Sequence, residues 1–183
     1  MRITSGTHRG RKLETPLGND IRPASDRVRQ AVFNMLLQYD MPQDAIVIDA
    51  FSGTGSYGLE ALSRGANSAA FFDNNNEALT LCRKNCAALK VENITKVVRH
   101  DLSRELKNTD ENAAANLLFI DPPYRQDLLP KAMNNLISGG WLTDECICVM
   151  EMEKSFDFSH NNIEIINDKT YGQSRILIGR YNA

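Results

Sequence analysis

Long hydrophobic runs are absent from this 183-residue sequence, and so is a strong excess of charge of either sign. No apolar stretch approaches the roughly 18 residues that a membrane span needs, and the first residues lack the apolar core of a signal peptide. The 21 basic and 23 acidic side chains leave a formal net charge of −2, which argues against a uniformly basic, non-specific nucleic-acid binder. We therefore expect a soluble, cytoplasmic, single-domain protein with no membrane partner.

Cysteine and histidine are also scarce. The four cysteines come in two pairs, Cys82 with Cys86 and Cys146 with Cys148, and neither pair has the CxxC spacing of a zinc knuckle. The three histidines show no ligand spacing either. We expect four buried free thiols and no metal site.

The small net charge is distributed unevenly. Residues 1–30 carry seven basic and three acidic side chains, a net charge of +4, whereas the remaining residues carry a net charge of −6. A basic arm ahead of an acidic body is typical of contact with a polyanion, although a solvated, flexible N-terminus would have the same charge. We assign Arg9, Arg11 and Lys12 to phosphate contacts, because positive charge positions a protein on RNA without selecting its sequence.

Short apolar runs alternate with helical patterns along most of the chain. Strands are expected at residues 45–50, 68–72, 94–99, 116–120, 145–150, 163–166 and 175–180. Helices are expected from Asp26 to before Pro42 and at residues 56–64, 75–89 and 128–137. This alternation predicts an α/β fold with a doubly wound, Rossmann-like parallel sheet of seven strands. No crossover helix joins the last two strands, which should form an antiparallel hairpin at the sheet edge. The whole chain, 1–183, should be one domain, with residues 1–40 forming a basic N-terminal extension and the first helix.

A glycine-rich loop, Asp49–Gly58, follows the first strand and opens the next helix. Its glycines permit a tight turn and close approach of a ligand, and open α/β sheets bind ligands beyond the carboxyl ends of their strands. The spacing satisfies the dinucleotide GxGxxG pattern, which leaves an NAD-linked oxidoreductase open. The acid before the loop favours S-adenosylmethionine, because a carboxylate attracts its cationic amino-acid end and repels a pyrophosphate. The predicted cofactor contacts in this segment are Asp49, Phe51, Gly53 and Gly55.

Acidic residues also follow the next two strands. Asp73 ends the second strand, where a carboxylate can accept hydrogen bonds from both ribose hydroxyls of an adenosine-bearing cofactor. The alternative role for Asp73 is to cap the next helix, which Asn74 or Asn75 could do instead. Asp101 follows the third strand and is expected to reach the adenine edge. Asn74 and Leu102 complete the predicted cofactor site.

The apolar strand at 116–120 ends in Asp121-Pro122-Pro123-Tyr124. Two prolines fix φ and remove two donors, so the local carbonyls are held rigidly. The amino group of a nucleobase is a weak nucleophile because its lone pair is delocalised into the ring. Asp121 and the Pro122 carbonyl can accept its two N–H bonds and direct the lone pair at a methyl group. Tyr124 can stack on an extruded base, and Pro123 and Arg125 are expected to contact the flanking RNA.

Taken in order, these motifs resemble the RsmD-type 16S rRNA guanine-N2 methyltransferases. The likeness covers nearly the whole chain and includes residues 9–13, 21–29, 49–58, 59–66, 121–124 and 171–172. It implies methyl transfer from S-adenosylmethionine to the exocyclic N2 of a guanine in small-subunit rRNA, at position 966 in the usual 16S numbering. It also implies action on an assembled or partly assembled 30S subunit. We expect the enzyme to be a monomer.

Other functions remain open. The same chemistry could target adenine N6 or cytosine N4 in DNA, although the chain leaves no room for a separate target-recognition domain. A non-catalytic rRNA-binding assembly factor could retain the cofactor fold. The segment around Arg22 is assigned to cofactor or RNA contact, with capping of the first helix by Ser25 or Asp26 as the alternative. Glu151 and Glu153 are assigned to the fold rather than to chemistry.

Overall fold

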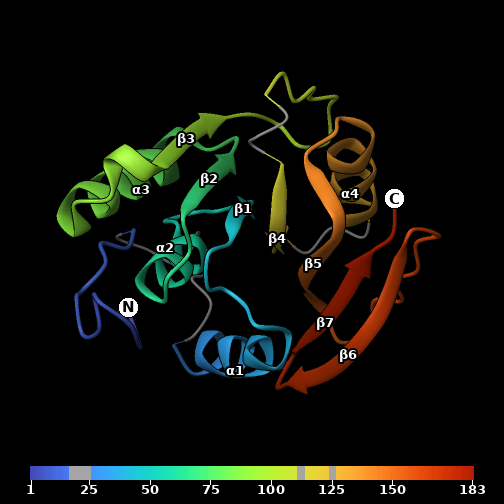
Figure 1. Cartoon of the computed structure of the whole chain (residues 1–183), viewed down its shortest axis with the longest axis horizontal. Coiled ribbons are helices and arrows are strands. Elements are labelled where there is room, and N and C mark those ends of the chain that lie inside the picture. Colours follow the sequence, from blue (N-terminus) through green and yellow to red (C-terminus); the bar gives the residue numbers. More distant parts are fainter. Residues whose placement is uncertain (17–25, 111–113, 124–126) are drawn as a thin grey trace.

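The computed structural model describes residues 1–16, 26–110, 114–123 and 127–183, and contains one seven-stranded sheet (Figure 1). The strand order is β3-β2-β1-β4-β5-β7-β6. The strands are β1 (Ile46–Ala50), β2 (Ser68–Asp73), β3 (Thr95–Arg99), β4 (Ala115–Ile120), β5 (Leu142–Glu153), β6 (Ile163–Tyr171) and β7 (Ser174–Tyr181). The α-helices are α1 (Asp26–Leu36), α2 (Ser56–Ser63), α3 (Asn76–Leu89) and α4 (Leu128–Ser138), and short 3-10 turns lie at Leu37–Tyr39 and Glu92–Ile94.

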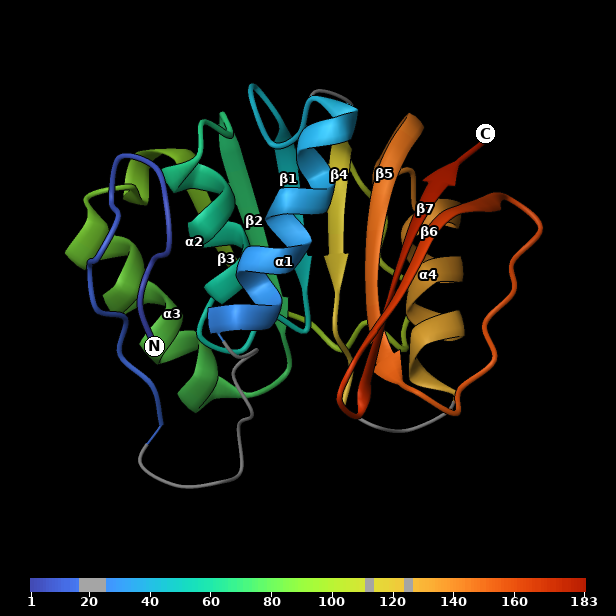
Figure 2. The ribbon, with the colours of Figure 1, turned by 90° about the horizontal axis from the view of Figure 1, so that it is seen from below.

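Helices cover both faces of the sheet, as the alternating pattern predicts. Val47 on β1 and Phe119 on β4 belong to the apolar layer beneath α1, α2 and α3. Ile48 belongs to the opposite layer, which packs against α4 through residues such as Met133. Consecutive residues of a strand point to opposite faces, so a strand buried on both sides is a continuous apolar run. The doubly wound α/β fold is confirmed, and Figure 2 shows α1 and α2 in front of the sheet.

The order in which the strands are added to the sheet reverses between β1 and β4. Strands β1, β2 and β3 are laid down outward in one direction, and the chain then returns to place β4 on the other side of β1. In open α/β sheets, such a reversal of strand order marks the ligand-binding crevice, at the carboxyl ends of the two central strands.

The last two strands form the expected antiparallel hairpin, and both it and β5 are longer than predicted. Strand β7 lies antiparallel between β5 and β6. Strand β5 continues to Glu153, and β6 continues through the polar residues 167–170 to Tyr171. Backbone pairing with β7 holds these residues in the sheet. Because their side chains are polar, the sequence pattern did not predict that they belong to a strand. Gly172, with a φ of 62°, lies in the connecting turn.

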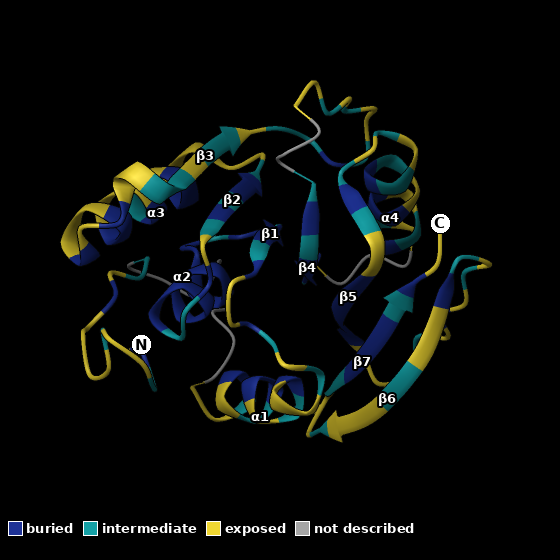
Figure 3. Ribbon diagram, in the orientation of Figure 1, coloured by how far each residue is buried: buried dark blue, intermediate teal, exposed yellow. Residues whose placement is uncertain are grey.

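The N-terminal extension is packed against α2. An antiparallel bridge pairs Arg2 with Lys12, and the side chains of Ile3 and Leu13 are buried in the core. This layer covers the outer side of α2, so that every residue of Ser56–Ser63 is buried (Figure 3). These contacts exclude a freely solvated arm over residues 1–13.

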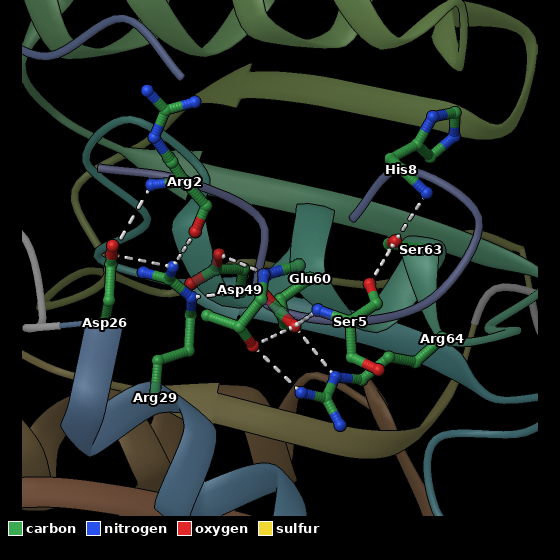
Figure 4. A network of polar contacts seen from close by, with 11 residues as sticks. Arg2, Ser5, His8, Asp26, Arg29, Asp49, Glu60, Ser63 and Arg64 are labelled. Carbon is green, nitrogen blue, oxygen red and sulfur yellow. Dashed lines mark hydrogen bonds and ion pairs between the residues drawn. The ribbon is translucent and has the colours of Figure 1, made fainter. Parts of the chain in front are cut away.

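Glu60 on α2 is the main polar attachment point of the extension (Figure 4). Its carboxylate accepts hydrogen bonds from the backbone N–H groups of Thr4 (2.8 Å) and Ser5 (3.1 Å) and from the Thr4 hydroxyl (2.6 Å). It also pairs with Arg29 Nε at 3.3 Å and Arg64 Nε at 2.8 Å. Arg29 and Glu60 are both fully buried, so their ion pair joins α1 to α2 inside the protein, and the hydrogen bonds to Glu60 attach the extension to the same carboxylate.

The four cysteines are buried and free, as predicted. Within the part of the chain that the structure describes, no helix has the length and apolarity to cross a bilayer.

Candidate functional site

The glycine-rich loop makes a tight strand-to-helix turn at the carboxyl end of β1. Gly55 is the residue before α2 and has a φ of 83°, a conformation that residues with a Cβ rarely adopt. Gly58 lies in the first turn of α2, where an added Cβ would come within 2.4 Å of the Phe71 ring. The small residues therefore let α2 begin directly against the sheet, with its N-terminus at the carboxyl end of β1.

Asp73 holds this loop to the end of β2. Its Oδ2 accepts a hydrogen bond from the backbone N–H of Gly53, and its Oδ1 accepts one from the N–H of Asn75, both at 2.8 Å. Asn75 caps α3 by accepting hydrogen bonds from the N–H groups of Glu77 and Ala78. The capping role thus belongs to Asn75. An ionised carboxylate has about four acceptor positions, so Asp73 retains capacity for ribose hydroxyls, and this contact stays a prediction.

Asp49 is a buried carboxyl at the carboxyl end of β1. Its Oδ2 accepts a hydrogen bond of 2.9 Å from the backbone N–H of Gly58. Burial raises the pKa of Asp49 from its usual value to about 8, with the negative charge of Asp73 adding to the increase and the Gly58 hydrogen bond opposing it. The side chain is therefore largely neutral at pH 7 until a positive charge lies beside it.

An open groove of about 690 Å³ lies beyond β2 and β3 and is lined by Asn74, Asn75, Arg99, His100, Asp101 and Arg104. Hydrogen bonds from the Ser103 hydroxyl and backbone N–H lower the pKa of Asp101, which stays ionised and can accept a hydrogen bond from an amino group. Asn74 also lines this groove. Leu102 differs from its neighbours, because its side chain is buried on the α4 side of the sheet and its carbonyl accepts a hydrogen bond from Asn135.

Asp121 and Pro122 directly follow β4, beside the glycine-rich loop. The backbone N–H of Asp121 donates to the carbonyl of Ala50, which ties the end of β4 to the end of β1. Burial raises the pKa of Asp121 well above its usual value, and the charges of Glu151 and Asp49 add to the increase. Pro122 is buried and Pro123 exposed. The predictions for Tyr124, Arg125 and Arg22 lie outside the described residues.

Two residues that sequence analysis did not assign to the site stand beside Asp121. Tyr57 on α2 donates a hydrogen bond of 3.0 Å from its hydroxyl to Oε2 of Glu151 on β5, and both side chains are buried. The Tyr57 ring stacks on Phe119, with centroids 5.0 Å apart. The sequence signal that could have found Glu151 is the alternation of side chains along β5, which places Glu151 on the same face of the sheet as Val149.

Among the described residues, no group of three or more His, Cys, Asp and Glu side chains is arranged to hold a metal ion.

The predicted phosphate-binding residues Arg9, Arg11 and Lys12 are all exposed on the N-terminal extension. The turn of the extension lies at the far end of α2, where the backbone N–H of Thr7 donates to the carbonyl of Ser63 (Figure 2). The chain then returns toward the glycine-rich loop. Arg9, Arg11 and Lys12 therefore lie on the part of the extension that runs along α2 from its far end. This helix is roughly 12 Å long at 1.5 Å per residue.

With this geometry established, comparison with known proteins decides the family. Residues 1–180 match the family described as Conserved hypothetical protein 95. The chain belongs to this family. The ribosomal RNA small subunit methyltransferase D of Escherichia coli K12 is 39% identical over 153 residues, which cover 84% of this chain and 75% of that protein. The resemblance to RsmD-type methyltransferases is thus confirmed.

Solved structures agree with this placement in the Conserved hypothetical protein 95 family. The E. coli protein yhhF is 34% identical, with a TM-score of 0.85 over 100% of this chain and 98% of that chain. An RNA methyltransferase from Salinibacter ruber, solved with S-adenosyl-L-homocysteine, is 14% identical with a TM-score of 0.67 and covers 88% of this chain and 94% of that chain. At that identity the Salinibacter likeness shows the fold alone. The relatives of this chain thus include methyltransferases, and its fold is shared with one solved with S-adenosyl-L-homocysteine, the product form of the cofactor S-adenosylmethionine.

The crevice of this chain fits that cofactor. Ser52, in the glycine-rich loop, has a buried hydroxyl oxygen that makes no hydrogen bond within the described residues. An orphaned polar atom of this kind costs free energy unless a ligand or water satisfies it. Asp49 adds a buried carboxyl that a cation would ionise, and the cofactor carries positive charge on its sulfonium and its amino group. The polar and acidic lining therefore suits a cationic ligand better than a pyrophosphate.

We expect cofactor affinity to depend on pH through Asp49. Because a cation favours the ionised carboxylate and the pKa of Asp49 starts at about 8, binding should release a proton near neutral pH. The Kd for S-adenosylhomocysteine should fall by up to about tenfold per pH unit from roughly pH 6 to 7.5. Calorimetry in buffers of different ionisation enthalpy should detect nearly one proton released per molecule bound at pH 7. Asp49→Asn should bind more weakly and lose this pH dependence, whereas an unchanged slope in the variant would exclude Asp49 as its source.

Proposed function

We propose that this protein transfers a methyl group from S-adenosylmethionine to the exocyclic N2 of a guanine in small-subunit ribosomal RNA, within an assembled or partly assembled subunit. The observation that carries the proposal is the position of Asp121 and Pro122, at the end of β4 and tied to the end of β1 beside the glycine-rich loop. The family membership and the name of the E. coli relative support the choice of ribosomal RNA.

The chain supplies acceptors for the amino group that is to be methylated. The bound cofactor provides an electrophilic methyl carbon on a sulfonium. The Asp121 carboxylate accepts one N–H of the base, and the Pro122 carbonyl accepts the other, so the nitrogen lone pair points at the methyl carbon. As the N–C bond forms and the sulfur–carbon bond breaks, the nitrogen becomes cationic and its proton passes to Asp121. Burial raises the pKa of this carboxyl, which makes it a better proton acceptor than an exposed aspartate.

The other predicted site residues fall into two groups, one proposed to bind the cofactor and one proposed to contact RNA. Asp49, Asp73 and Asp101 are proposed to hold the amino-acid, ribose and adenine parts of the cofactor. The exposed Arg9, Arg11 and Lys12 are proposed to contact phosphates on the α2 side of the protein. Because this basic surface is small, the enzyme should depend on the folded rRNA or on ribosomal proteins to present the base.

The experiment that tests this function is labelled methyl transfer followed by nucleoside analysis. Unmethylated small subunits, the same subunits stripped of protein, and duplex DNA would each be incubated with the enzyme and labelled S-adenosylmethionine. We expect N2-methylguanosine in rRNA, formed best on the subunits. Recovery of N6-methyladenosine would overturn the choice of base, and labelled DNA would overturn the choice of nucleic acid.

A further inference from the structure

Glu151 is a second carboxylate in the proposed methyl-transfer site, level with Asp121 on the neighbouring strand. The parallel pairing of β4 with β5 sets Ile120 opposite Met150, so the residues that follow, Asp121 and Glu151, lie side by side. Phe119 and Val149, two residues earlier on each strand, belong to the layer beneath α1 and α2. Because side chains alternate along a strand, Asp121 and Glu151 project to that same face.

The Glu151 side chain is held in one position. Tyr57 donates to Oε2 at 3.0 Å, and the Tyr57 ring is itself fixed by stacking on Phe119 at an interplanar angle of 15°. The residue is only 7% exposed. Within the described residues, Oε1 accepts no hydrogen bond. Glu151 therefore presents one fixed acceptor oxygen beside Asp121.

Asp121 is likewise available to a ligand. Its backbone N–H is used in the contact with Ala50, but its carboxylate accepts no hydrogen bond from the described part of the chain. The two neighbouring carboxyls repel each other, and the charge of Glu151 helps to raise the pKa of Asp121. A ligand with two adjacent N–H donors would relieve this repulsion, because each carboxylate would accept one strong hydrogen bond.

Guanine is the nucleobase with such an edge. Its N1–H and its N2 amino group are adjacent donors, whereas the amino groups of adenine and cytosine lie beside a ring nitrogen that is an acceptor. A carboxylate facing that ring nitrogen would lose its hydrogen bond and meet a lone pair.

We propose that Glu151 determines base specificity by accepting the N1–H of the guanine whose N2 amino group is held by Asp121. This inference rests on the proposed function and adds to it a reason why the site selects guanine over adenine. Tyr57 is a positioning residue, which acts by orienting Glu151.

The test uses 2-aminopurine, which keeps the 2-amino group but has an acceptor in place of the N1–H. Small subunits reconstituted with guanine or with 2-aminopurine at the methylated position would be compared as substrates. Wild-type enzyme should prefer guanine by about 10²–10⁴-fold, because a site built for an N–H donor rejects an analogue that lacks it. Glu151→Gln can donate its amide N–H to the ring nitrogen, so it should lose about 10–100-fold on guanine and bring the preference below about tenfold.

Matched variants separate this role from a structural one. Glu153→Gln, at an exposed position on the same strand, should leave both rates unchanged. Tyr57→Phe should weaken the preference for guanine by a smaller factor. All variants should bind S-adenosylhomocysteine with the wild-type Kd, which shows that the site has folded. If Glu151→Gln slows both substrates by the same factor, Glu151 does not select the base. If wild-type enzyme forms no N2-methylguanosine at all, the proposed function itself fails.

Discussion

Asp121→Ala is expected to slow methyl transfer by about 10³-fold while the protein stays folded, because removing one preorganised electrostatic group or proton acceptor has effects of this size. The carboxylate is proposed to hold an N–H of the base and to take the proton released on methylation. Single-turnover transfer to saturating small subunits would measure this rate directly, free of product release.

Three controls make the Asp121 result specific. Asp121→Asn keeps an acceptor oxygen but cannot take the proton, so it should lose less activity than the alanine variant. Asp157→Ala, at an exposed position, should have the wild-type rate. Calorimetry with S-adenosylhomocysteine should show that the Asp121 variants still bind the cofactor product. A rate within tenfold of wild type for Asp121→Ala would contradict the proposed mechanism.

Glu60→Gln should lower the free energy of unfolding by about 3–5 kcal/mol, the cost of breaking a buried ion pair by removing one partner. Arg29 is fully buried, and its Nη1 already has no hydrogen-bond partner within the described residues. Without Glu60, its positive charge would keep, among the described residues, the partly exposed Asp26 as its ion-pair partner, at 3.0 Å. Urea denaturation at pH 7 would measure the change, which corresponds to a fall in Tm of roughly 6–20 °C for a domain of this size.

Glu164→Gln provides the matched control, because Glu164 is exposed on β6. It should change the unfolding free energy by no more than about 0.5 kcal/mol. Limited proteolysis should also cut the N-terminal extension of Glu60→Gln faster than that of wild type, since one of the two carboxylate oxygens that accept hydrogen bonds from Thr4 and Ser5 becomes an NH₂ donor. A loss of stability below about 1 kcal/mol would show that Arg29 finds another partner when Glu60 is neutral.

The central sheet could be predicted because its signal is local. Strands such as 46–50 and 115–120 are buried on both faces and so are continuous apolar runs between helical patterns. The hairpin limits were harder, because polar residues 167–170 stay in the sheet by backbone pairing with β7. The pattern of side chains along residues 167–170 does not indicate that pairing.

The motifs in the sequence predicted which segments come together at the candidate site. The glycine-rich loop and Asp121-Pro122 are contiguous segments, and parallel topology brings them together at one edge. For Leu102, the position after Asp101 did not show that its side chain turns into the core. Glu151 was assigned to the fold because an acidic residue on a strand has no distinctive neighbours in sequence.

The sequence by itself determined the α/β class, the order of the elements, the glycine-rich loop and the Asp-Pro-Pro segment, because each depends on residues close together along the chain. Only the tertiary structure decided that the basic extension packs on α2 through Glu60 and that Tyr57 orients Glu151 beside Asp121. The physical reason is that these contacts join residues 55 and 94 positions apart, respectively. Their energy arises from burial and hydrogen-bond geometry that exist only once the sheet has brought distant segments together.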